Sequence, residues 1–165
     1  MNRICLVIMA LAGSLGMAQT SDAAKEMPKF YKLDFVVKDM EGGKVITARN
    51  YSVIVESPTM AGSMNQIRAG SKVTISTSPS TSTTIDIGTN IECNRVMEME
   101  NSLSFQLIAE VSSVLGETDP HPVIRQNKWS SVVIVPFKKP TVVFSSDDAT
   151  SKRVLQLEVT ATPRI

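Results

Sequence analysis

Apolar side chains recur at every second position through most of this chain, and that period constrains its fold more than any other feature of the sequence. The clearest run has apolar residues on one side and mostly polar residues between them: Leu103, Phe105, Leu107, Ala109 and Val111. A period of two places alternate side chains on opposite faces of a strand, whereas one face of a helix needs a period of about 3.6. The chain is therefore predicted to consist of strands that each bury one face.

Segments of this kind, separated by turn residues, recur from residue 29 to residue 162. Gly42 and Gly43 can supply a tight turn, so residues 29–56 are predicted to form a long β-hairpin. Residues 95–101 are either one helical turn or a hairpin connection. Further strands are expected at residues 66–77, 84–94, 103–113, 123–135, 140–146 and 152–162. The predicted fold is all-β, an antiparallel β-sandwich of seven or eight strands in one domain over residues 29–162.

Two local features interrupt this pattern. Gly70, inside the strand expected at residues 66–77, marks a bulge or a close approach of two backbones. Residues 76–84, STSPSTSTT, contain nothing apolar to bury. They are therefore predicted to form a mobile, exposed loop.

The first residues are typical of a secretory signal peptide. Arg3 supplies one positive charge, an apolar run follows, and small residues at Gly16 and Ala18 fit cleavage after Ala18. Residues 1–18 are therefore predicted to be removed and residues 19–28 to form a flexible mature N-terminus. The protein is expected to be exported, to the periplasm or out of the cell.

Cysteine placement and charge narrow the functional classes. Cys5 lies inside the apolar run rather than behind it, which argues against lipid attachment of the lipoprotein type. Cys93 is then the remaining thiol, and it shares an alternation face with Ile85, Ile87 and Ile91, so burial is predicted over pairing with another chain. The chain has 17 basic and 16 acidic residues. This balance does not favour a nucleic-acid partner.

Candidate catalytic and metal-binding residues are few. His121, the single histidine, lies between two prolines in an expected loop and is interpreted as solvated. Asp147 and Asp148 lack the alternate carboxylates and the glycine of a calcium loop, and are interpreted as a turn between strands. No catalytic residue, metal ligand or cofactor is therefore assigned. Asp86, Glu92 and Glu110 lie on outward faces, where folding could bring a catalytic carboxylate pair together.

The segment that contains the single tryptophan gives the most specific expectation. If residues 136–140 form a hairpin loop, the strands on either side pair directly, and one face of the pair is wholly apolar. The predicted core residues of this hairpin are therefore Val132, Ile134, Val142 and Phe144. Lys138 and Lys139, beside Pro136 and Pro140, would protect the apolar flanks from aggregation.

Trp129 falls on the other face of the same predicted hairpin. Tryptophan and arginine are enriched at interaction hot spots. A binding surface for a protein or a glycan is therefore predicted at Arg125, Asn127, Lys128 and Trp129. The alternative is that a second sheet or a loop of the same chain covers this face.

Four segments in order resemble the C-terminal β-domain of bacterial secretins: IRAGSKV, TIDIGTNIEC, LSFQLIAEVSSV and PVIRQNKWSSVVIVPFKKPTVVF. The likeness is one of strand pattern and covers roughly residues 66–145. Secretins usually have a glycine-rich ending after the valine-rich strand, where this chain has Ser145-Ser146-Asp147-Asp148. No functional residue and no membrane-pore activity are carried over. The resemblance implies an exported β-domain that associates through strand edges or within an envelope assembly.

The functional hypothesis from the sequence is an exported, non-enzymatic β-sandwich that binds or scaffolds another component of the cell envelope. Its contacts would be sheet edges, including self-association, or the Arg125–Trp129 surface. The alternative is a small hydrolase or carbohydrate-active enzyme that uses a carboxylate pair assembled by the fold.

Overall fold

The computed structural model describes residues 27–59, 63, 65–78, 81–115, 123–147 and 152–164. The expected signal peptide and His121 lie outside these residues. No helix in the described part of the chain is long and apolar enough to cross a membrane. The described residues form eight strands, as the period of two predicts.

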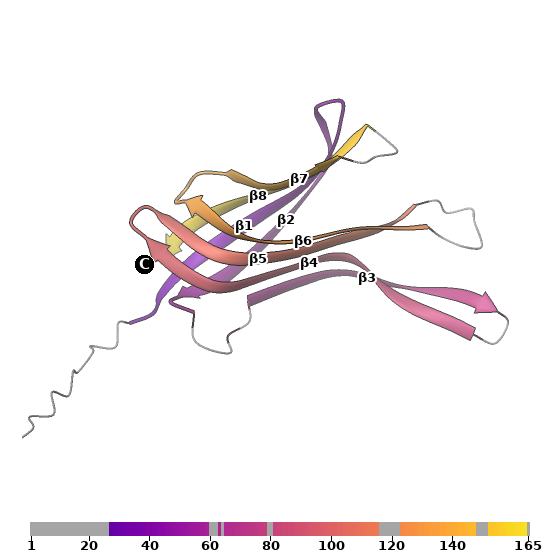
Figure 1. Cartoon of the computed structure of the whole chain (residues 1–165), viewed down its shortest axis with the longest axis horizontal. Coiled ribbons are helices and arrows are strands. Elements are labelled where there is room, and N and C mark those ends of the chain that lie inside the picture. The colour runs from indigo at the N-terminus through magenta and orange to yellow at the C-terminus, as the bar shows by residue number, and fades with distance from the viewer. Residues whose placement is uncertain are drawn as a thin grey trace, which may run out of the picture.

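The strands form two antiparallel four-stranded sheets (Figure 1). The first sheet has the order β2-β1-β8-β7, with β2 at Lys44–Ser57, β1 at Lys29–Glu41, β8 at Arg153–Arg164 and β7 at Thr141–Asp147. The second sheet has the order β3-β4-β5-β6, with β3 at Asn65–Ser78, β4 at Thr81–Met99, β5 at Ser102–Leu115 and β6 at Val123–Pro136. The predicted all-β antiparallel sandwich is confirmed.

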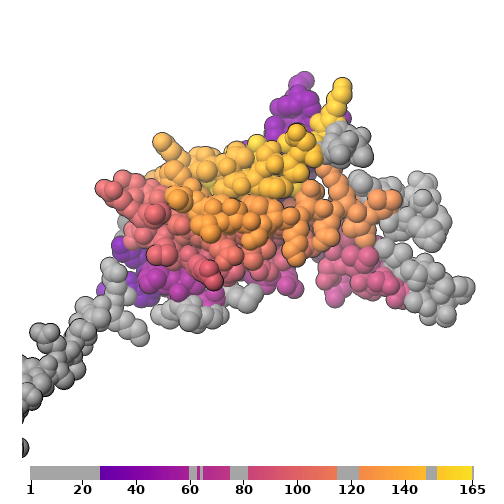
Figure 2. Space-filling view, in the orientation of Figure 1, coloured from indigo at the N-terminus to yellow at the C-terminus, as the bar shows by residue number. Residues whose placement is uncertain are grey.

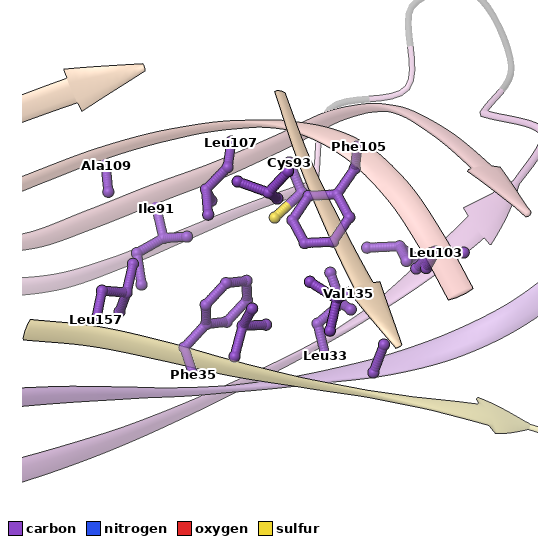
Figure 3. Packing of buried hydrophobic residues seen from close by; sticks show 14 of the residues in the cluster. Leu33, Phe35, Ile91, Cys93, Leu103, Phe105, Leu107, Ala109, Val135 and Leu157 are labelled. Carbon is purple, nitrogen blue, oxygen red and sulfur yellow. The ribbon is translucent and has the colours of Figure 1, made fainter. Parts of the chain in front are cut away.

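The core lies between the two sheets, and the alternation in the sequence predicts most of it. Figure 3 shows Phe35 and Leu157 of the first sheet opposite Ile91, Leu107 and other side chains of the second. Burial alternates strictly along residues 31–37 of β1, 103–109 of β5 and 155–161 of β8, where every second residue is buried. Each fully buried Leu or Phe side chain contributes about 1.5–3 kcal/mol to folding.

The β1–β2 hairpin is confirmed, and its turn uses positive φ angles at Gly42 (56°) and Gly43 (80°). The tip of this hairpin and the β3–β4 hairpin project from the body of the molecule in different directions (Figures 1 and 2). Residues 41–50, around the first of these tips, are exposed. The two sheets therefore pack tightly over only part of the strand length.

The predicted hairpin across residues 136–140 is wrong. β6 pairs with β5 and β7 pairs with β8, so the two strands belong to different sheets. The connecting residues cross between the sheets: the Phe137 amide donates to the Asn101 carbonyl at 3.1 Å, and the Lys138 amide donates to the Ala161 carbonyl at 2.8 Å. Tyr31 stacks on Phe137 at this crossing, with ring centroids 5.6 Å apart.

The core face predicted for these strands is wrong for the same reason. Val133 and Val135 are buried, whereas Val132 and Ile134 of the predicted core set are 70% and 56% exposed. Val142, of the same set, is 49% exposed, and Phe144 is partly buried against the core. A bulge between Val142 and Phe144 shifts the register of β7, so the two do not share a face.

Two connections are shorter in the structure than predicted. Most of residues 76–84 lies in strands, because Ser76 pairs with Ser82 and Ser78 with Thr81. A loop over all of these residues is therefore wrong, and the mobility of the segment stays a prediction. Residues 95–101 form no helical turn: β4 continues to Met99 past an irregularity where Arg95 has a φ of 52°.

Candidate functional site

Trp129 lies on the inward side of β6 and contacts the first sheet. Its indole stacks on the Phe144 ring, with centroids 4.6 Å apart and an interplanar angle of 15°. Trp129 is partly buried and packs against the core. The expected position on the face opposite the core is therefore wrong, and the alternative, that a second sheet covers this face, is confirmed.

The other three residues of the predicted binding surface do not all lie on the same face of β6. Arg125 and Asn127 alternate with Lys128 along β6, and both are half-buried, whereas Lys128 is exposed. The Lys128 Nζ lies 3.7 Å from Glu110 Oε2 on the outer face of β5. The structure therefore separates Lys128 from Arg125, Asn127 and Trp129, and the binding role of the four stays a prediction.

Two of the three acidic residues proposed for the alternative enzyme, Glu92 and Glu110, lie among cross-strand amides. Glu92 Oε1 accepts hydrogen bonds from Gln66 Nε2 at 2.7 Å and from Asn90 Nδ2 at 3.3 Å. Glu110 Oε1 accepts one from Gln126 Nε2 at 2.7 Å. These contacts form a polar ladder over the outer face of the second sheet, a structural arrangement. Across the part of the chain that the structure describes, no three His, Cys, Asp or Glu residues could hold a metal ion.

Apolar side chains gather on the outer face of the second sheet beyond this polar ladder. Ser104 of β5 lies between Met97 of β4 and Ile134 of β6 in the register, and the next outward residue of β6 is Val132. Exposed Met97, Met99, Val132 and Ile134 define the outer apolar patch. The patch is not predictable from the alternation alone, because Val132 and Ile134 were expected in the core.

β6 also forms an edge of the second sheet. Over its 14 residues it pairs with β5, and no other strand among the described residues pairs with it. Residues 123–135 contain no proline, so every residue there has a backbone N–H. Edge strands that are long, apolar and unprotected are templates for pairing with another chain. This edge, bordered by the outer apolar patch, is the candidate functional site.

Two titratable groups lie in the core rather than at this site. Cys93 is a free, buried thiol, as predicted, and burial raises its pKa from 9.0 to about 12. Burial, with a smaller contribution from Glu98, raises the Tyr31 pKa from 10.0 to about 12. A thiol with so high a pKa is not a nucleophile near neutral pH, so Cys93 has a packing role.

No protein-family model matches the sequence, and comparison with curated proteins found no match either. Solved secretin structures are similar in fold. The type II secretin GspD from enteropathogenic Escherichia coli matches with a TM-score of 0.50 at 11% identity, over 84% of this chain and 66% of that chain. The secretin InvG of the Salmonella SPI-1 type III secretion injectisome has a TM-score of 0.49 at 10% identity, over 84% of this chain and 64% of that chain.

The chain thus spans less than two thirds of the length of the InvG chain. The likeness covers more of this chain than the pattern at residues 66–145 suggested. The expected resemblance to secretins is confirmed as a resemblance in fold.

Proposed function

We propose that this protein is an exported, non-enzymatic β-sandwich that scaffolds an assembly of the cell envelope by pairing through the β6 edge. The observation that carries the proposal is the unpaired side of β6, a 14-residue strand that ends the second sheet. An added strand would satisfy its free backbone groups, and the side chains beside the edge would then select the partner.

The outer apolar patch supports this reading. Val132 and Ile134 lie on the edge strand itself, and both are more than half exposed. Charged side chains that commonly protect an edge are absent from residues 129–136, and Lys138 and Lys139 follow the strand rather than lie on it. Burial of the two aliphatic side chains against a partner would add to the backbone hydrogen bonds.

Two further observations support an envelope location and a non-enzymatic role. The N-terminal pattern is typical of an export signal, and the fold resembles that of the secretin GspD. The carboxylates of Glu92 and Glu110 are engaged by neighbouring amides in the polar ladder. Binding through a sheet edge therefore has more support than hydrolysis by a carboxylate pair.

In-cell photocrosslinking tests the proposal. A photoreactive residue placed at Val132 should give discrete crosslinked species, whereas the same residue at Val142 should give none. Val142 is a matched control because it is exposed on β7, one of the two edge strands of the other sheet.

A second crosslinking experiment, with a lysine introduced on β6, distinguishes pairing through the β6 edge from a partner that merely lies near it. With the photoreactive residue kept at Ser130, Ile134→Lys should remove the crosslinks, because a lysine on the edge opposes strand addition. Val142→Lys should leave them in place. Equal crosslinking from positions 132 and 142, or crosslinks that survive Ile134→Lys, would contradict the proposal.

A further inference from the structure

β4 and β5 separate part of the way along their length. Their last pair in this direction is Thr89 with Val111. Beyond it, β4 continues back to Thr81 paired with β3, and β5 continues to Leu115 paired with β6. Figure 1 shows the β3–β4 hairpin diverging from β5 and β6. Within the described residues, the facing edges of residues 82–87 and 112–114 are unpaired, and we name the space between them the notch.

The apex of the notch explains why the strands part. Gly88 has a φ of 144° and lies directly opposite Gly70 of β3. A Cβ at Gly88 would lie 2.2 Å from the Ala69 carbonyl oxygen, and one at Gly70 would lie 2.0 Å from the Ile87 oxygen. The two backbones therefore approach at a distance that glycine permits, and β4 bends away from β5.

At this apex, the Ser112 side chain takes the place of the next backbone hydrogen bonds between β4 and β5. The Gly88 amide donates to Ser112 Oγ at 3.0 Å, and the Ser112 hydroxyl lies 3.5 Å from the Gly88 carbonyl oxygen. The buried hydroxyl thus satisfies the polar groups where the ladder stops. The unpaired edges beyond it begin at a fixed point, which is how a preformed strand-binding site would be built.

Grooves flank the notch on both sides of the sheet, and their linings differ. The groove on the outer side has a volume of about 520 Å³ and includes the carboxylates of Asp86 and Glu110. The groove on the inner side has a volume of about 530 Å³ and includes Tyr51, Ile87 and Val114. On the outer side, the two strands that border the notch contribute carboxylates. On the inner side, apolar and aromatic side chains lie beside Arg49.

We propose that the notch binds an extended peptide strand in which basic and apolar side chains alternate. In an extended strand, successive side chains point to opposite faces. Basic residues would meet Asp86 and Glu110, and apolar residues would meet Ile87 and Tyr51 on the inner side. The backbone of the peptide would pair with β4 or β5 at the edges that they leave open. This site is distinct from the β6 edge and does not depend on the proposed function.

Asp86 is the residue that gives the peptide its charge preference. In the part of the chain that the structure describes, its carboxylate has no hydrogen-bond or ion-pair partner, whereas Glu110 contacts Gln126 and Lys128. Arg68 and Lys72 also line the outer groove, but they lie on β3, one strand further from the notch. Lys72 lies opposite Asp86 in the β3–β4 register, on the side of β4 away from the notch, whereas Asp86 lies on the strand that borders the notch.

The test uses the purified full chain and a fluorescently labelled ten-residue peptide of alternating lysine and isoleucine. Anisotropy at low salt should show saturable binding. A peptide with glutamate in place of lysine, and one with the same residues in two blocks, should bind at least about tenfold more weakly, because charge sign and period decide the fit. Asp86→Lys should weaken binding by about tenfold or more, and the matched exposed variant Asp147→Lys by less than about twofold.

Amide hydrogen exchange locates the peptide. Residues 82–87 or 112–114 should gain protection when the peptide binds, and circular dichroism should show that Asp86→Lys leaves the fold unchanged. Protection confined to β6, or equal binding of the lysine and glutamate peptides, would overturn the proposal. So would concentration-dependent protection of the notch without peptide, because a second copy of the chain would then be its occupant.

Discussion

The indole of Trp129 on β6 stacks on the phenyl ring of Phe144 on β7, with ring centroids 4.6 Å apart. The two strands are consecutive in the chain but belong to different sheets. The aromatic pair therefore joins the sheets directly at this side of the sandwich. Offset-stacked pairs add about 0.5–1.5 kcal/mol beyond the burial of their surface.

Truncation of this contact should reduce stability. Trp129→Ala removes the stack and leaves a void against the core, so we expect the free energy of unfolding to fall by about 2–4 kcal/mol. Trp129→Phe keeps an aromatic ring and should cost about 1 kcal/mol. Urea unfolding followed by far-ultraviolet circular dichroism measures both, since the variants lack tryptophan fluorescence.

Lys128→Ala is the control for the Trp129 variants, because Lys128 is the neighbouring exposed residue of β6. Its loss should change the free energy of unfolding by less than about 0.5 kcal/mol. If Trp129→Ala were as neutral as Lys128→Ala, the indole would not be packed between the sheets as described.

The close approach of Gly88 to β3 should make this position intolerant of any side chain. Gly88→Ala places a Cβ at 2.2 Å from a carbonyl oxygen and also strains φ, so unfolding should become easier by about 4 kcal/mol or more. Gly43→Ala is the matched control: φ is 80°, but nothing lies within 4 Å. It should cost only about 1–2 kcal/mol from backbone strain. Similar melting temperatures for the two variants would contradict the tight contact at Gly88.

Burial of the Cys93 thiol should make it unreactive in the folded protein. Its pKa of about 12 leaves almost no thiolate at pH 8, so iodoacetamide should modify Cys93 only through unfolding. Mass spectrometry should show slow labelling in buffer and rapid labelling in denaturant. Rapid labelling of the native protein would show that the thiol is accessible.

The raised pKa values of Cys93 and Tyr31 also set an alkaline limit on stability. Both groups are neutral in the fold up to about pH 12, but in the unfolded chain they ionise near 9.0 and 10.0. The unfolded state then binds fewer protons, so the free energy of unfolding should fall as pH rises from 9 to 12. Below pH 9 this contribution should be complete. Urea titrations between pH 7 and pH 11 check the direction, and Cys93→Ala should flatten part of the slope.

The sequence predicts which residues form strands because alternation is a local property. Leu103 to Ala109 and Leu155 to Ala161 bury the predicted side chains, and each set could be read within one strand. Strand partners are not local. Residues 136–140 are compatible with a hairpin turn or with a crossing between sheets, and hydrogen bonds to Asn101 and Ala161, distant in sequence, select the crossing. The partner strand of β6 also decides whether the Trp129 side chain faces the core.

At the candidate site and the notch, too, local features could be predicted from the sequence and strand partners could not. Gly70 predicted a bulge or a close backbone approach, and its contact with Gly88 confirms the approach. Its partner could not be identified without the β3–β4 register. The outer apolar patch could not be predicted either. Val132 and Ile134 are aliphatic, like core residues, and only the arrangement of the two sheets places them on the outer face.

Amide hydrogen exchange along β6 tests the central claim most directly, because it reports backbone pairing rather than proximity. In an antiparallel edge strand about half of the amides face the neighbouring strand and half face outward. In the isolated protein, the outward amides of Val123–Pro136 should exchange rapidly, and they should become protected when the protein is recovered in its crosslinked envelope assembly. If those amides stay unprotected in the assembly while its other contacts are intact, β6 is not the edge through which this protein assembles.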